Sequence, residues 1–149
     1  MTWLPHSTVA TVVVRDDRFL MVEEVDDGLT VFNQPAGHLD ENETLFEAAV
    51  RETLEETGWR VTLTHYLGTY VYKRPNGFTY IRHCFIATPV RHDPDLPLDA
   101  GIIAAHWLTA EEILDPAFAV RSPLVVQAVT DYLAGVRLPL DSIHHRLDS

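Results

Sequence analysis

The chain has 149 residues, the length of one domain, and 22 acidic against 11 basic residues give it a formal charge of −11. Hydrophobic residues make up 46% of it, enough for a packed core, which argues against intrinsic disorder. The acidic balance argues against a binder of nucleic acid polymers or of anionic membranes, since either needs a basic surface. No run approaches the roughly 18–20 apolar residues of a membrane span, and the N-terminus does not resemble a secretory signal. With a single cysteine, Cys84, we expect a cytoplasmic protein.

In chain order, the first half predicts strands over 8–14, 19–25 and 30–33, a loop over 34–38, and a helix that begins after Thr44. The second half predicts strands over 59–72, 80–87 and 103–108, a turn at 75–77, a loop over 91–99, and helices that begin after Thr109 and after Ser122. Thr44 and Glu47 have the spacing of a capping box, and Gly58 favours a left-handed stop. Because strands and helices do not alternate regularly, the prediction is one α+β domain over 1–149, an α/β/α sandwich.

Three glutamates of the predicted helix carry the functional signal. Glu52, Glu55 and Glu56 stand at i, i+3 and i+4 and share a face, where they repel one another near the negative end of the helix dipole. A hard divalent cation, which prefers oxygen ligands, would explain this arrangement. Arg51 is within i±4 reach of Glu47 and Glu55 and would hold a carboxylate in place. The alternative is a solvated acidic face with ordinary i,i+4 pairs.

The rest of the helix is expected to pack on the core. Phe46, Val50 and Leu54 form the opposite, apolar face. Ala48 and Ala49 lie beside the acidic face, where their small side chains would leave room for a ligand.

The pattern from Gly37 to Trp59 resembles the Nudix box. Five residues separate Gly37 from Glu43 and seven separate Glu43 from Arg51, with Glu52, Glu55, Glu56 and Gly58 at the remaining specific positions. The two aliphatic positions of the box hold Thr53 and Trp59 instead, a departure that concerns packing and not chemistry. The resemblance implies the Nudix fold, a mixed sheet between helices with the box as loop–helix–loop. It also implies hydrolysis of phosphoanhydrides with Mg²⁺, for which Mn²⁺ is a possible substitute.

Features outside the box resemble the NudJ-type phosphatase branch of the family. They cover most of the chain from 6 to 143 and comprise His6, residues 32–39, Arg82, Trp107–Leu108, residues 111–113 and residues 121–125. This resemblance implies release of the terminal phosphate from nucleoside tri- and diphosphates and from thiamine pyrophosphate and related compounds. The partner expected is therefore a small-molecule phosphoanhydride, and no apolar stripe in the sequence indicates an oligomeric state.

The family pattern implies roles for the residues of the box. The metal ligands would be Glu52, Glu55, Glu56 and the carbonyl group of Gly37. The catalytic set would be Glu52 as the first choice of general base, with Arg51 and Glu55. Glu43 would support the box, and Asp99 could add a carboxylate from a loop, although a turn aspartate is the alternative.

Residues outside the box are candidates for substrate binding. Arg82 and Arg121 could bind phosphate. The alternatives are a strand-edge arginine in a cross-strand pair for Arg82 and helix-entry packing for Arg121. His38 could contact phosphate or be an exposed loop histidine. Tyr72, together with Tyr70, Phe78 and Tyr80, could stack on a ring or pack within a hairpin. His144 and His145 are expected in a solvated tail.

Two other functions remain open from sequence. The first is an internal pyrophosphatase acting on ADP-ribose or an oxidised nucleotide. Pro75 lies sixteen residues after the box, near where ADP-ribose hydrolases of the family carry a proline, but 75–77 is more simply a hairpin turn. The second is a non-catalytic module that senses a nucleotide. It is disfavoured because modules of that kind tend to lose glutamates of the box, and all of them are present here.

Overall fold

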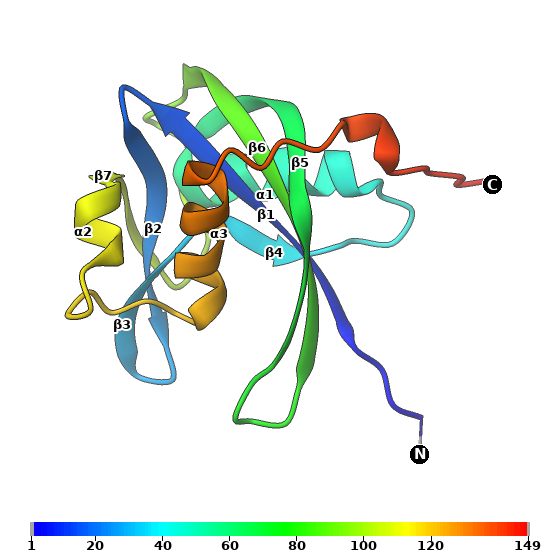
Figure 1. Cartoon of the computed structure of the whole chain (residues 1–149), viewed down its shortest axis with the longest axis horizontal. Helices are drawn as coiled ribbons and strands as arrows, with labels where there is room; N and C mark the ends of the chain where they lie inside the picture. Colours follow the sequence, from blue (N-terminus) through cyan, green and yellow to red (C-terminus); the bar gives the residue numbers. More distant parts are fainter. Residues whose placement is uncertain (1, 149) are drawn as a thin grey trace.

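The computed structural model describes residues 2–148, which form a mixed seven-stranded sheet with helices on both faces (Figure 1). The strands are β1 (His6–Arg15), β2 (Arg18–Asp26), β3 (Leu29–Asn33), β4 (Ala36–His38), β5 (Trp59–Lys73), β6 (Thr79–His92) and β7 (Ile102–Thr109). The helices are α1 (Leu45–Thr57), α2 (Ala110–Leu114) and α3 (Pro123–Leu133), followed by a 3₁₀ turn at Leu140–Ser142. The order along the sheet is β3-β2-β1-β6-β5, with β4 beside β1 and β7 beside β2. Strands β1 and β6 are parallel, and the other pairs are antiparallel.

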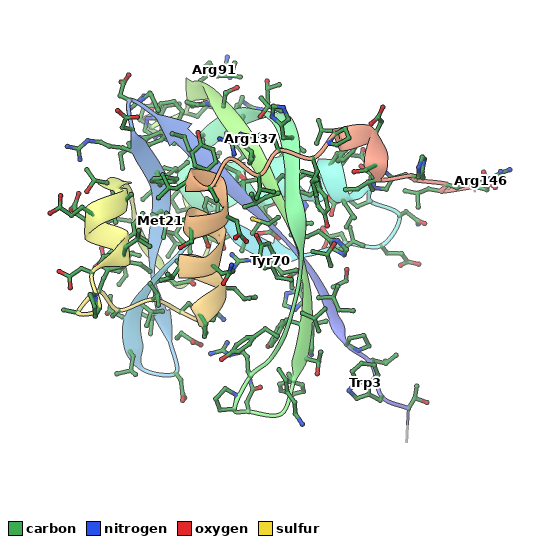
Figure 2. All side chains as sticks on the ribbon, viewed as in Figure 1. Trp3, Met21, Tyr70, Arg91, Arg137 and Arg146 are labelled. Atoms are coloured by element: carbon green, nitrogen blue, oxygen red, sulfur yellow. The ribbon has the colours of Figure 1, made fainter. Side chains whose placement is uncertain are left out.

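Alternating side chains of β1 supply the two faces of the core. Val9 packs on one face with Ala48 and Ala49 of α1. Ala10 and Val12 point to the other face and join the core residues of α2 and α3, where Met21 also lies (Figure 2). Because successive strand residues face opposite sides, one strand can serve both layers. The sandwich predicted from the sequence is confirmed.

Helix α1 begins and ends at its predicted signals. The Thr44 hydroxyl accepts the Glu47 N–H, the Glu47 carboxylate accepts the Thr44 N–H, and Gly58 adopts the left-handed conformation at φ 76°. The expectation for Ala48 and Ala49 is wrong, because both are buried in the core and leave no space for a ligand. Glu47 is likewise taken up by the cap, so it is not a partner of Arg51.

Removing this cap should weaken the helix. We expect Thr44→Ala to lower the free energy of unfolding by about 1 kcal/mol, because the Glu47 N–H loses its acceptor. For a chain of this length that is a fall in Tm of about 2–4 °C, measured by thermal denaturation. Thr44→Ser keeps the hydroxyl and is the matched control. A Tm of the alanine variant equal to that of the control would contradict the prediction.

Two segments differ from the sequence-based expectation. Residues 36–38, predicted as loop, form β4 and pair with Thr8–Ala10 of β1, so the box begins on a strand. In the C-terminal tail, His144 is exposed as expected, but His145 is packed against α1 and not solvated. The His145 ring accepts the Leu45 N–H at the start of α1 at 3.0 Å and lies edge-on to Phe46. Contacts with distant parts of the chain determine the structure of both segments, which local sequence patterns do not reveal. Within residues 2–148, no helix is both long and apolar enough to cross a membrane.

Candidate active site

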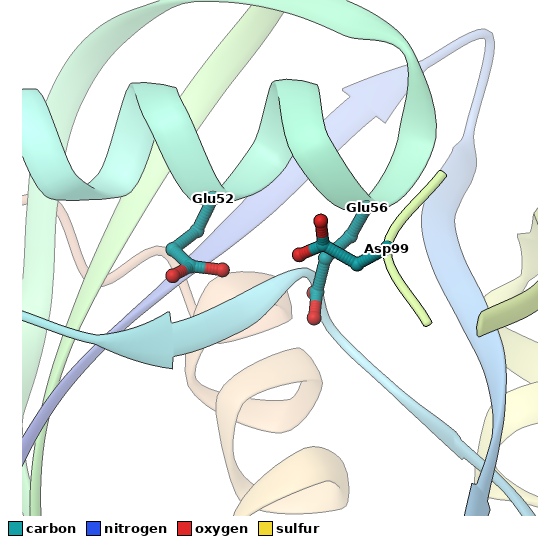
Figure 3. Close-up of side chains that lie close together, drawn as sticks. All are labelled: Glu52, Glu56 and Asp99. Atoms are coloured by element: carbon teal, nitrogen blue, oxygen red, sulfur yellow. The ribbon is translucent and has the colours of Figure 1, made fainter. Parts of the chain in front are cut away.

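Three carboxylates meet where α1 faces β4. One oxygen from each of Glu52, Glu56 and Asp99 lies within 4.8 Å of the others (Figure 3). Two come from one face of α1 at i and i+4, and Asp99 comes from the loop before β7. The Asp99 N–H donates to the Glu55 carbonyl at 3.1 Å, which ties this loop to the end of α1. The cluster therefore has the donor set that a hard divalent cation prefers.

Burial disfavours negative charge on the two glutamates of the cluster. Glu56 is 8% exposed, and its burial, reinforced by nearby Glu24, Glu52 and Asp99, raises its pKa to about 8. Burial also raises the pKa of Glu52, although Arg51 opposes the shift. Carboxylates held together in this way gain most from a cation between them.

Arg51 connects the loop before α1 to the cluster. Its guanidinium donates to both oxygens of Glu43, at 2.6 and 3.0 Å, and to Glu52 at 2.8 Å. It also donates to Glu55 at 3.2 Å and to the His38 carbonyl at 3.1 Å. The Arg51 hydrogen bond holds the pKa of Glu43 below its usual range. Arg51 thus holds Glu52 directly and makes the predicted i,i+4 pair with Glu55, while Glu43, and not Glu47, holds the guanidinium itself.

Strand β4 lies against the two helical ligands. The Ala36 N–H donates to Glu56 Oε1 at 2.8 Å. A Cβ atom at Gly37 would overlap the carboxyl group of Glu52, so the glycine is required by this close approach. Its φ is outside the left-handed region, so conformational freedom is not the reason. Glycine and alanine at these positions let the strand pass directly beside the carboxylates.

A pocket of about 210 Å³ adjoins the same strand. Its lining residues are Thr8, Asn33, Ala36, Gly37, His38, Tyr72, Arg74, Tyr80, Arg82, Arg121, Ser122 and Leu124. Tyr72 of β5 and the alternate residues Tyr80 and Arg82 of β6 form part of its wall, together with Arg74, which directly follows β5. Since Ala36 and Gly37 touch both the pocket and the carboxylates, the two sites are adjacent.

Arg82 places a buried positive charge in this pocket. It is 6% exposed and donates to Asn33 Oδ1 at 3.0 Å and Gln34 Oε1 at 3.3 Å, both neutral groups. Within residues 2–148, no carboxylate oxygen lies within 4 Å of its guanidinium. The strand-edge alternative is wrong, because β6 lies between β1 and β5. A buried guanidinium without a carboxylate partner favours an anionic ligand.

Two further arginines line the pocket in ion pairs. Arg121, a candidate from sequence, bonds Glu24 at 2.9 Å and lies 3.6 Å from Asp26. Arg74 bonds Asp26 at 2.8 Å. Sequence reasoning did not find Arg74, Asp26 or Glu24, and it singled out Asn33 only as part of residues 32–39.

Aromatic and imidazole rings border the pocket. His38 Nε2 lies 3.3 Å from His6 Nδ1, and the His6 ring stacks on Tyr80. Burial lowers the pKa of His38. Tyr72 lines the pocket, whereas the Tyr70 hydroxyl donates to Asp131 of α3 at 2.6 Å and is used structurally (Figure 2). Tyr72 and Tyr80 are therefore the predicted rings that line the pocket, and one face of Tyr80 is covered by His6.

The remaining box residue, Glu55, lies apart from the cluster. Its side chain is 41% exposed and bonds Arg51. The structure brings together Glu52, Glu56, Asp99 and Gly37 of the predicted set, and separately Arg82, Arg121, His38 and Tyr72. A role of Glu55 as a ligand stays a prediction.

Known proteins match this chain over most of its length. The profile of the NUDIX domain family matches residues 4–128. The curated protein Phosphatase NudJ of Escherichia coli K12 is 42% identical over 139 residues, 93% of this chain and 90% of its own length.

Comparison with solved structures also finds Nudix proteins. A NUDIX hydrolase from Nitrosomonas europaea has a TM-score of 0.94 and 42% identity, with 98% of this chain and all of the other covered. An ADP-ribose pyrophosphatase from Streptococcus suis has a TM-score of 0.67 at 12% identity, covering 91% of this chain and 96% of its own, and shows the fold alone.

Proposed function

Because this chain belongs to the Nudix family and is a hydrolase of phosphoanhydrides, we propose that it releases the terminal phosphate of nucleoside tri- and diphosphates and of thiamine-type pyrophosphates, with Mg²⁺ as cofactor. One observation carries the proposal: a cluster of three carboxylates lies directly beside a pocket that contains a buried arginine, Arg82, which has no carboxylate partner among residues 2–148. A polyphosphate would reach both, with its end at the carboxylates and the remainder in the pocket.

The residues present fit a divalent cation. Glu52, Glu56 and Asp99 would hold it through oxygen, and the Gly37 carbonyl is a further candidate donor. When bound, Mg²⁺ would neutralise charge on the phosphate oxygens and lower the pKa of a water. This charge matters because both the protein, at −11, and its substrate are anionic.

As an alternative to its role as a ligand, Glu52 would accept a proton from the attacking water through its second oxygen, with Glu56, Asp99 and the Gly37 carbonyl left to hold the cation. Arg51 fixes one of its oxygens at 2.8 Å, and burial raises its pKa toward the range of a useful general base. Glu43 would keep Arg51 in place through its two hydrogen bonds. The terminal phosphate would leave as inorganic phosphate, with the proton on the leaving group or in solvent.

Arg82 would bind the next phosphate of the substrate. We expect Arg82→Gln to lower kcat/KM by at least about tenfold, since a hydrogen bond to a charged group contributes about 1.5–3 kcal/mol. Arg82→Lys keeps the charge and should retain more activity. Initial rates of phosphate release measure the effect, with thermal denaturation as a check on folding. Equal kcat/KM for wild type and both variants would remove Arg82 from the substrate site.

The test of function is product identity. The protein is incubated with thiamine pyrophosphate, GTP, GDP and ADP-ribose, with and without Mg²⁺, and the products are separated. Mg²⁺-dependent inorganic phosphate from the first three supports the proposal. Pyrophosphate from GTP, or AMP from ADP-ribose, would instead assign cleavage of an internal anhydride. Pro75 does not favour that outcome, because it lies in the turn closed by the Gly77 N–H to the Arg74 carbonyl at 2.9 Å.

A further inference from the structure

Asp26 connects two arginines of the pocket. It stands at the end of β2, where it accepts a hydrogen bond from Arg74 at 2.8 Å and lies 3.6 Å from the Arg121 Nε. Arg74 follows β5, and Arg121 precedes α3, so three separate segments converge on this one carboxylate. Asp26 is part of the ion-pair network that borders the pocket and is not one of its lining residues.

The charges at the pocket are nearly balanced by this network. Arg74, Arg82 and Arg121 bring three positive charges, and Glu24 and Asp26 bring two negative ones. The hydrogen bond from Arg74 and the charge of Arg121 hold the pKa of Asp26 below its usual range, so it stays ionised. The pocket therefore offers a substrate a net charge of about +1, centred on Arg82, whereas the three arginines alone would offer +3.

We propose that Asp26 is a specificity-determining residue that limits the negative charge of the substrate by neutralising Arg74 and, together with Glu24, Arg121. The inference rests on the proposed function, in which the part of the substrate beyond the terminal phosphate occupies this pocket. A second anionic group there would have to displace Asp26 from its arginines or accept its repulsion. Substrates with one phosphate in the pocket are thereby favoured over those with two.

The substitution Asp26→Asn tests this with little change in shape. An asparagine oxygen can still accept from Arg74, so the tie between the hairpin tips β2–β3 and β5–β6 is retained while the charge is lost (Figure 1). Asp27→Asn is the matched control. Asp27 is the next residue of the same turn, at φ 52°, a conformation that asparagine tolerates, and its carboxylate bonds neither arginine.

Binding is measured by calorimetry at low salt and in the presence of Mg²⁺, with the methylene-bridged analogues of inorganic pyrophosphate and tripolyphosphate, which lack the scissile P–O–P bond. We expect Asp26→Asn to raise the affinity for tripolyphosphate relative to pyrophosphate by at least about fivefold, and the gain to shrink at high salt. Arg74→Gln should shift the ratio the other way, and Asp27→Asn should leave it unchanged. An unaltered ratio in folded Asp26→Asn, or the same shift in the control, would overturn the inference.

Turnover separates this inference from the proposed function. The ratio of kcat/KM for GTP to that for GDP should rise in Asp26→Asn by a similar factor. If wild-type protein releases no phosphate from any substrate, the proposed function fails. The binding ratio still decides the role of Asp26, because it needs no catalysis.

Discussion

We expect Glu56→Gln to abolish the Mg²⁺-dependent activity, with a loss of at least about 10²-fold in kcat. Even residues that only support metal ligands typically cost 10–100-fold on mutation. Glu56 is the most buried of the three clustered carboxylates, and the amide of glutamine keeps the acceptor for the Ala36 N–H but not the charge. Phosphate release and Mg²⁺ binding by calorimetry measure the effect. Activity within tenfold of wild type would exclude Glu56 as a ligand.

Without metal, the same substitution should stabilise the fold, in contrast to its harmful effect on activity. The pKa of Glu56 is raised from its ordinary 4.5 to about 8, so the folded protein holds this proton more tightly than the unfolded chain. The resulting stability is fully present below pH 4.5 and is lost as the pH rises to 8. Glutamine has no such dependence. In EDTA at pH 8.5 we expect Glu56→Gln to be more stable than wild type by about 1–3 kcal/mol, or roughly 3–10 °C in Tm.

Two comparisons isolate the cause of that difference. Near pH 5 the wild-type glutamate is protonated and resembles glutamine, so the two Tm values should approach each other. Mg²⁺ at pH 8.5 should stabilise wild type by mass action and leave the variant unchanged. A Tm difference that is independent of pH would show that packing, and not the buried charge, accounts for it.

The helix was predictable from sequence because its signals are local. Thr44, Glu47 and Gly58 act within a turn of the helix ends, and each performs the expected role. The prediction that Glu52, Glu55 and Glu56 are equivalent as metal ligands was less secure. Sharing a helix face does not decide which of these side chains point at β4. Glu55 turns to Arg51, a consequence of the loop that brings Glu43 against the same guanidinium.

The pocket could not be predicted because its walls are distant in sequence. The parallel register of β1 with β6 joins Thr8 to Arg82, and only that pairing shows that Arg82 is central and buried. Asp26 and Arg74 are 48 residues apart in sequence and form a hydrogen bond between the tips of the β2–β3 and β5–β6 hairpins. In the sequence, a charged residue at a turn cannot be distinguished from one that is simply exposed to solvent. The ion pair between two such residues therefore becomes visible only when the order of the strands is known.

We expect Gly37→Ala to reduce activity by at least about 10²-fold with a fall in Tm of no more than about 2 °C. The added methyl would overlap the Glu52 carboxyl group, the flexible end of its side chain, so Glu52 moves and the fold persists. Displacing a catalytic group by about 1 Å can cost 10²-fold. The backbone at Gly37 suits alanine, since its φ is not in the left-handed region.

Gly135→Ala gives the reverse pattern and serves as the control. Gly135 has φ 89° after α3 and open space around it, so alanine there strains the backbone without touching the site. That variant should lose about 1 kcal/mol of stability and keep its activity. Thermal denaturation and phosphate release, measured on both variants, thus separate the two reasons for a glycine. If Gly37→Ala were destabilised like Gly135→Ala but remained active, the contact of β4 with Glu52 would have no catalytic role.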